Sequence, residues 1–232
     1  MSATVILDLY GTLAEPDWPA LLHGRAELAR RFGIDAAAAQ AAWERTHASR
    51  MIGAYGHLAD DLATVFTEAS AGPPLRISSG VRAELAAAER ENWNRGVRLY
   101  PDAAPALGLL RASGLRLAIV TNASAEAAGV IDTLGLRELV DDVFASCDAG
   151  LLKPGLLGVA LRGLGIDASQ ATLVDDEPAQ LDGAARLGIG TILVRRRGTD
   201  ASGATTAVAH RSVSDLRDAV DLAVPAAPAR RQ

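Results

Sequence analysis

The chain has 232 residues, of which 49% are hydrophobic and only 4% aromatic, so its core must be built from aliphatic side chains. The formal net charge of −5 argues against a general nucleic-acid-binding protein. The single cysteine, Cys147, excludes an intrachain disulfide, and we find neither a signal peptide nor a long apolar segment, so we expect a cytoplasmic protein without membrane partners.

An apolar run opens the chain and ends in an aspartate. Residues 5–7 form an unbroken apolar stretch, which is typical of a parallel strand covered on both faces. Asp8 follows this stretch, and a turn begins at Gly11 and Thr12. A carboxylate at the carboxyl end of a buried parallel strand lies in the crevice where open α/β sheets bind ligands. An aspartate that merely caps the strand would fit this stretch equally well.

The segment 14–96 has helical periodicity. Its apolar residues recur at spacings of three and four, and Asp17, Asp35 and either Ser78 or Ser79 stand where they can cap helices. Residues 71–74 interrupt the pattern. We find no strand pattern here, and therefore predict an inserted helical cap domain over 14–96.

From residue 97 onward, short apolar strands alternate with helices. The predicted strands cover residues 115–120, 143–145, 171–174 and 191–194. This alternation predicts a Rossmann-like, doubly wound parallel sheet with helices on both faces. We assign residues 1–13 and 97–200 to this α/β core domain and expect a C-terminal helix within 201–224 to complete it. The tail 225–232 is expected to be disordered, and the arginines 195–197 to lie in a solvated loop.

Polar side chains follow the ends of four strands. They are Asp8, the pair Thr121 and Asn122, Lys153, and the acidic pair Asp175 and Asp176. Taken singly, each has an ordinary alternative, such as a turn hydroxyl, a surface cation or a helix cap. Because the carboxyl ends of parallel strands meet at one edge of a sheet, these groups converge on one crevice. Together they predict a catalytic site.

Four ordered motifs resemble those of the haloacid dehalogenase-like hydrolase superfamily, with a helical cap inserted after the first motif. The likeness covers residues 4–195. Asp8 followed by Leu-Tyr-Gly-Thr matches the first motif, and the apolar strand ending in Thr121 matches the second. Lys153, preceded by Gly-Leu-Leu and followed by proline, matches the third, and the acidic pair 175–176 matches the fourth.

The resemblance implies catalytic roles for these residues. Asp8 would attack the substrate and form a covalent intermediate. Thr121 and the Asn122 amide would hold an anionic oxygen of the substrate. Lys153 would offset the negative charge on Asp8 and on the substrate.

Tyr10 departs from the pattern of the family phosphatases, most of which carry an aspartate there that protonates the leaving oxygen. A tyrosine hydroxyl with a pKa of ~10 is a poor acid near neutral pH. Losing a general acid typically costs about 10²–10⁴ in rate. The form Asp-Leu-Tyr-Gly-Thr occurs in L-2-haloacid dehalogenases, whose halide leaving group needs no proton. Tyr10 therefore favours carbon–halogen chemistry.

The acidic pair favours a metal-dependent phosphatase instead. The resemblance implies that Asp176 binds Mg²⁺ together with Asp8 and the Tyr10 carbonyl, while Asp175 is oriented toward Lys153. Three carboxylates and one ammonium leave a formal charge of about −2, which a divalent cation can balance. We weight the acidic pair above the tyrosine, because a missing acid is tolerated when the leaving group departs easily. A sugar 1-phosphate or an aryl or acyl phosphate has such a leaving group.

The first interpretation is therefore a Mg²⁺-dependent phosphatase acting on a small phosphorylated metabolite. A metal-free L-2-haloacid dehalogenase is the second. A non-catalytic binding protein stays open as the third, because Tyr10 replaces the usual acid and Leu181 stands where many family phosphatases carry a further acidic residue. In the cap, Arg50, His47, Tyr55 and His57 are candidates for substrate contact, although a cation at a helix end is stabilising without any substrate. The sequence leaves a homodimer open.

Overall fold

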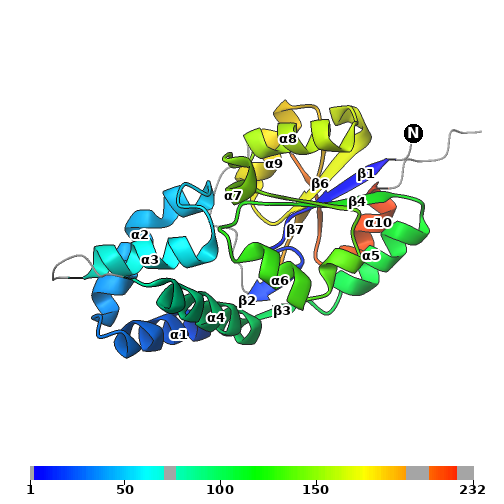
Figure 1. Ribbon diagram of the computed structural model, residues 1–232. Coiled ribbons are helices and arrows are strands. Elements are labelled where there is room, and N and C mark those ends of the chain that lie inside the picture. Colours follow the sequence, from blue (N-terminus) through cyan, green and yellow to red (C-terminus); the bar gives the residue numbers. More distant parts are fainter. Residues whose placement is uncertain (1–2, 71–76, 197–208, 224–232) are drawn as a thin grey trace, which may run out of the picture.

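A computed structural model describes residues 3–70, 77–196 and 209–223 of the protein. A parallel sheet flanked by helices forms one lobe, and a cluster of four helices forms the other (Figure 1). The interruption predicted at 71–74 and the tail predicted to be disordered at 225–232 lie outside the described residues. No described helix combines the length and the hydropathy that crossing a bilayer requires.

Six strands form the central sheet in the order β5-β4-β1-β6-β7-β8, and each neighbouring pair is parallel. They are β1 (Thr4–Leu7), β4 (Arg116–Thr121), β5 (Asp142–Ala145), β6 (Ala171–Asp175), β7 (Gly190–Val194) and β8 (Arg211–Val213). Strand β1 lies at the centre, where Ile6 is paired with Ala118 and Leu173. The predicted doubly wound, Rossmann-like α/β fold class is confirmed.

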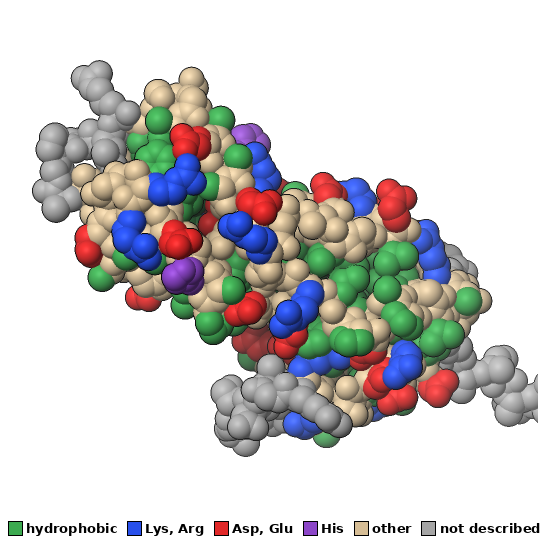
Figure 2. Space-filling view, turned by 90° about the horizontal axis from the view of Figure 1, so that it is seen from below, with side chains coloured by type: hydrophobic (Ala, Val, Ile, Leu, Met, Phe, Trp, Pro, Cys, Tyr) green, Lys and Arg blue, Asp and Glu red, His purple; other side chains and the backbone are tan. Residues whose placement is uncertain are grey.

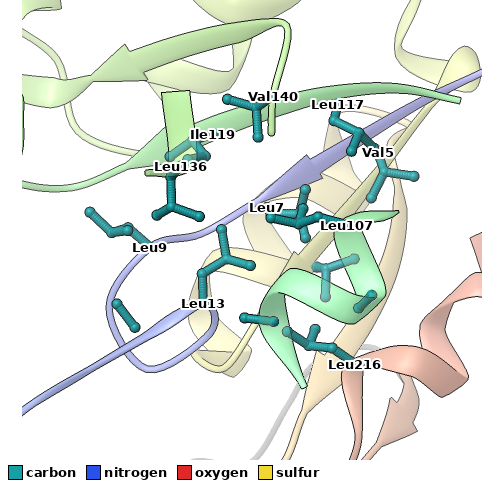
Figure 3. Packing of buried hydrophobic residues seen from close by; sticks show 14 of the residues in the cluster. Val5, Leu7, Leu9, Leu13, Leu107, Leu117, Ile119, Leu136, Val140 and Leu216 are labelled. Carbon is teal, nitrogen blue, oxygen red and sulfur yellow. The ribbon is translucent and has the colours of Figure 1, made fainter. Parts of the chain in front are cut away.

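Helices cover both faces of the sheet because successive strand residues point to opposite sides. Val5 and Leu7 belong to one apolar cluster, which also contains Leu107 and Leu216 (Figure 3). Ile6 belongs to the cluster on the other face. Helices α5 (Ala103–Ala112), α6 (Ala127–Thr133) and α10 (Ala219–Ala223) contribute to the first cluster, and α8 (Gly155–Leu164) and α9 (Pro178–Arg186) to the second. Between β5 and α8 lies the short helix α7 (Ser146–Ala149).

The second lobe consists of α1 (Trp18–Arg31), α2 (Ala36–Met51), α3 (Leu58–Ala69) and α4 (Ser79–Gly96). The predicted caps are formed at Asp17, at Asp35 and, of the two candidate serines, at Ser78. Each accepts a hydrogen bond from a backbone N–H of the first turn. This lobe has an apolar cluster of its own, which includes Leu62 and Phe66. Figure 2 shows acidic and basic side chains interspersed over both lobes.

Two short antiparallel strands join the lobes. β2 (Ala14–Pro16) pairs with β3 (Val97–Leu99), so the prediction of no strand between 14 and 96 is wrong at its first residues. A three-residue strand that contains a proline is too short to show a periodic pattern. Its partner lies more than eighty residues away in the chain, so only the folded structure reveals the pairing.

Arg196 does not lie in a solvated loop, contrary to the prediction for residues 195–197. It is buried and donates hydrogen bonds to Asp102 at 2.7 Å and to the Thr12 carbonyl. Asp102 also accepts the backbone N–H of Leu216 at 2.8 Å. This arginine therefore fastens the loop after β1 to the start of α5. Arg197 lies outside the described residues.

Candidate active site

Asp8, Lys153 and Asp175 meet at the carboxyl ends of the central strands. The Lys153 ammonium donates to Asp8 Oδ1 at 2.6 Å and to Asp175 Oδ2 at 2.6 Å, and all three side chains are buried. The backbone N–H of Asp8 donates to the Val174 carbonyl at 3.0 Å, which continues the pairing of β1 with β6. The predicted convergence of residues from distant parts of the chain therefore occurs. Lys153 is also the only lysine in the 232-residue sequence.

Asn122 holds the segment that presents the lysine. Its side-chain oxygen accepts the backbone N–H of Lys153 at 2.8 Å. The loop after β4 and the residues before α8 are thereby fixed to one another. This contact was not predicted, because the family resemblance implied for Asn122 only a role in holding a substrate oxygen.

An acidic cluster lies around Asp8. Each of Asp8, Asp175 and Asp176 offers a carboxylate oxygen, and these oxygens lie within 4.8 Å of one another. Asp176 Oδ1 also accepts the Thr12 hydroxyl at 3.2 Å. Gly11 has φ +83°, and a Cβ there would lie 2.2 Å from Asp176 Oδ2. Glycine is therefore needed at position 11 both for the backbone conformation and for the approach of Asp176.

The pKa values of the acidic pair reflect an excess of negative charge. Burial, and then the charge of Asp8, raise the pKa of Asp175 to about 7, against the lowering effect of Lys153. Burial and Asp8 likewise raise the pKa of Asp176 to about 6. Burial alone would lower the pKa of Lys153, but its two ion pairs outweigh burial and raise that pKa. The single positive charge of Lys153 does not balance the negative charges of the three carboxylates. Carboxylate oxygens that lie this close together are the kind of ligands that Mg²⁺ binds.

Two hydroxyls beside this cluster are buried and have no hydrogen-bond partner among the residues that the structure describes. They belong to Thr121, at the end of β4, and to Tyr10. An unpaired buried hydroxyl costs roughly 1–3 kcal/mol, so an oxygen of a bound substrate would relieve it. Burial raises the pKa of Tyr10 well above its ordinary value, and the charges of Glu126 and Asp8 raise it further. Tyr10 is thus an even weaker acid than the sequence alone indicated.

A hollow of about 260 Å³ opens between the lobes beside Tyr10. This tryptophan hollow is lined by Trp18, Trp43 and Trp93 together with Tyr10, Arg25 and Asn122. His47 and Arg50 also line it, whereas His57 lines a separate hollow and Tyr55 lines neither. Two of the four predicted cap residues therefore face the hollow beside Tyr10.

Arg50 is held by the protein itself. It is 2% exposed and donates to the Thr46 hydroxyl at 3.2 Å, the Ser124 hydroxyl at 3.4 Å and the Trp43 carbonyl at 2.9 Å. Its guanidinium also stacks 4.0 Å from the centre of the Trp43 ring. With these bonds Arg50 ties α2 to the loop after β4, and its predicted contact with a substrate stays a prediction.

Sequence reasoning missed Arg25 and Glu89. Arg25 Nε donates to Glu89 Oε1 at 2.8 Å, and the guanidinium lies 3.8 Å from the centre of Trp43. A signal was present in the helical periodicity. Arg25 follows Leu21 by four residues, and Glu89 follows Leu85 by four, so both charges occupy the apolar stripes of their helices. A charge in such a stripe indicates a buried partner or a functional site.

Position 181 adds no further carboxylate to the acidic cluster. Leu181 is fully buried in the core. The neighbouring Asp182 pairs with His210 at 3.0 Å. It is not among the three aspartates whose oxygens converge.

Comparisons with known proteins agree with this architecture. A sequence profile of the haloacid dehalogenase-like hydrolases matches residues 3–188. Phosphoglycolate phosphatase from Rhodospirillum rubrum is 32% identical over 102 residues, which are 43% of this chain and 42% of that enzyme, so the match spans less than half of either protein. Phosphatase MT3486 from Mycobacterium tuberculosis is 30% identical over 155 residues, 65% of this chain and 68% of the relative.

Solved structures with the same fold include both kinds of enzyme. The L-2-haloacid dehalogenase from Xanthobacter autotrophicus superposes with a TM-score of 0.62 at 20% identity, over 96% of this chain and 98% of that one. A phosphatase from Thermococcus onnurineus superposes with the same TM-score of 0.62, also at 20% identity, over 95% and 97% of the two chains. At such identities the likeness shows the fold and does not choose between the two chemistries.

Proposed function

The chain belongs to the haloacid dehalogenase-like hydrolases, and we propose that it is a Mg²⁺-dependent phosphatase of small phosphorylated metabolites. The observation that carries the proposal is the convergence of three carboxylates, those of Asp8, Asp175 and Asp176, of which the first two share the single ammonium of Lys153. Both curated relatives are named as phosphatases, which supports the same assignment. A cytoplasmic location belongs to this proposal as well.

Asp8 is the proposed nucleophile. Lys153 occupies its Oδ1, while Oδ2 accepts no hydrogen bond from the described residues, so Oδ2 is the oxygen that attacks. The new bond joins Asp8 to phosphorus as the bond to the leaving oxygen breaks, and water then hydrolyses the aspartyl phosphate. The Thr121 hydroxyl would donate to a phosphoryl oxygen, together with the Asn122 amide.

The proposed metal site consists of Asp8, Asp176 and the carbonyl of Tyr10. Mg²⁺ there would offset the charge that the phosphoryl group and the carboxylates bring together. Asp175 is not one of the proposed ligands, because both of its oxygens already accept hydrogen bonds. Its Oδ2 accepts from the Lys153 ammonium, and its Oδ1 accepts from the backbone N–H of Glu177 at 2.9 Å. It would keep Lys153 beside the nucleophile.

The leaving group has to depart without a strong acid. Tyr10 stands at the acid position with a pKa above its ordinary value, so we expect alkyl phosphates to be poor substrates. Aryl phosphates, acyl phosphates and sugar 1-phosphates release an oxygen that needs less protonation. The helices α1 to α4 are proposed to act as a cap that shields this step from water.

Tyr10 also supports a second function, the metal-free dehalogenation of 2-haloacids. In that reaction Asp8 would attack carbon and a halide would leave unprotonated. The acidic pair argues against dehalogenation. The excess of carboxylates repels the negative charge of the attacking Asp8 and that of an anionic haloacid.

One set of assays separates these functions. The phosphatase proposal predicts release of p-nitrophenol from p-nitrophenyl phosphate with Mg²⁺, loss of this activity with EDTA, and none in Asp8→Asn. Metal-independent chloride release from 2-chloropropionate would establish the dehalogenase instead. Absence of both reactions would leave the non-catalytic interpretation.

A further inference from the structure

We propose that the leaving group of the substrate is a single aromatic ring with an acidic substituent, and that Arg25 selects it in the tryptophan hollow. This inference rests on the proposed phosphatase function and adds the substrate class to it. Four observations carry it: the position of the hollow, its size, its walls and the free donors of one arginine.

The hollow lies where a leaving group would go. It is lined by Tyr10, two residues after the nucleophile, and by Asn122, the residue after Thr121. Because Tyr10 and Asn122 belong to the segments that carry Asp8 and Thr121, we place the hollow on the leaving-group side of a phosphoryl group bound there. When Asp8 bonds to phosphorus, the phenolate leaves into this space with the electron pair of the broken bond.

The size of the hollow limits the leaving group. An apolar cavity of about 150 Å³ binds benzene, whereas sites for drug-sized ligands span about 300–1,000 Å³. A volume of about 260 Å³ therefore suits one substituted ring and is too small for a nucleoside.

The walls of the hollow are planar and mostly apolar. Aromatic residues make up only 4% of the sequence, yet all three tryptophans line this space. Tyr10 lies 5.4 Å from Trp93, and Trp18 meets Trp93 edge to face at 6.0 Å, measured between ring centres. Aromatic rings favour such stacked and edge-on neighbours, so these walls fit a flat ring better than a sugar. A phenolate is also the kind of leaving group that the weak acid at Tyr10 requires.

Arg25 supplies directional recognition. Its guanidinium is fixed between Trp43 at 3.8 Å and Trp93 at 5.4 Å. Within the described part of the chain its one hydrogen bond runs from Nε to Glu89, so the four N–H groups of its two terminal nitrogens are unused. A fixed planar fork with free donors binds a carboxylate through two hydrogen bonds at little entropic cost. Arg50, by contrast, already donates to three protein groups.

The test compares phenyl phosphate with 3-carboxyphenyl phosphate, whose phenols are similar leaving groups. Charge-assisted hydrogen bonds to Arg25 should raise kcat/KM for the carboxylated ester by about 10- to 100-fold. In the double variant Arg25→Gln/Glu89→Gln, which leaves no unpaired carboxylate, this preference should fall to about one. Should that variant fail to fold, Arg25→Lys keeps the charge but loses the fork, and the preference should still fall severalfold.

Arg31 and Glu84 provide the matched control. They also join α1 to α4 at 2.8 Å, but on the surface, with side chains 60% and 51% exposed. Arg31→Gln/Glu84→Gln should keep the wild-type preference. A wild-type preference near one, or a preference that survives in the Arg25 variants, would overturn the inference while phenyl phosphate turnover still supports a phosphatase. If neither ester is hydrolysed, the phosphatase proposal itself is overturned, and this inference with it.

Discussion

Replacing Lys153 by methionine should destabilise the protein strongly. Both ion pairs of Lys153 are 2.6 Å long, and the exposed fractions of the side chains are 2% for the lysine, 9% for Asp8 and 1% for Asp175. Removing one partner of such a buried pair typically costs about 3–5 kcal/mol, because the other charge is left without compensation. We therefore expect Lys153→Met to lower the free energy of unfolding by about that amount at pH 8, without Mg²⁺.

The choice of pH follows from the sign of the linkage. The pKa of Lys153 is raised in the fold, so its stabilisation is fully present below the pKa of the unfolded chain, ~10.4, and is lost only as the pH rises through the higher folded value. At pH 8 the lysine is charged in both states. Urea denaturation followed by circular dichroism measures the difference.

A double-mutant cycle isolates the electrostatic part of this loss. Asp175→Asn in the Lys153→Met background removes one of the unpaired carboxylates and should recover part of the stability, whereas Asp175→Asn alone should be destabilising. Arg31→Met is the control, because exposed pairs such as Arg31–Glu84 contribute about 0–1 kcal/mol. A loss below about 1 kcal/mol for Lys153→Met, or no recovery in the double variant, would refute the charge balance described for the site.

Three further changes test separate parts of the protein. Thr121→Val removes a buried hydroxyl that has no partner among the described residues, so the stability measured by thermal melting should hold or rise. The kcat/KM for p-nitrophenyl phosphate should fall by about 10²–10³. Unchanged activity would exclude Thr121 as a hydrogen-bond donor to the substrate. Gly11→Ala places a Cβ 2.2 Å from Asp176 Oδ2 at φ +83°, so calorimetry should find Mg²⁺ affinity lost, and wild-type affinity would contradict this geometry. Burial, opposed by Arg50, raises the pKa of Asp61 to about 7, so the folded state binds the proton more tightly and stability is lost as the pH rises from about 4 to 7. Asp61→Asn should remove this pH-dependent loss of stability, which is at most about 4 kcal/mol. If the difference in unfolding free energy between the variant and the wild type stays constant over that pH range, the raised pKa of Asp61 is contradicted.

The fold could be predicted from the sequence where its elements are long or apolar. The buried run before Asp8 and the alternation after residue 97 predicted the sheet, because strands covered on both faces need unbroken apolar stretches. Strand β8 was missed since its three residues include exposed Arg211 and Ser212 at the sheet edge. No local pattern distinguishes such a strand from a loop.

The site was predictable where each residue follows its own strand. Asp8, Lys153 and Asp175 meet because parallel strands end at one edge, and this is a property of topology. Arg25 and Glu89 come from different helices of the other lobe, and their meeting depends on how these helices pack. Sequence periodicity marks such charges as unusual but does not pair them.

The acidic cluster around Asp8 is proposed to bind a magnesium ion, and Lys153, the single lysine of the sequence, is a direct reporter of that binding. In protein labelled with ¹⁵Nζ-lysine, NMR should give one side-chain signal, from Lys153, whose ammonium contacts Asp8 and Asp175 at 2.6 Å. Titration with Mg²⁺ should shift this signal in a saturable manner in the wild-type protein, and not in Asp176→Asn. A signal that stays in place at millimolar Mg²⁺, or an identical response in both proteins, would contradict magnesium binding by the acidic cluster.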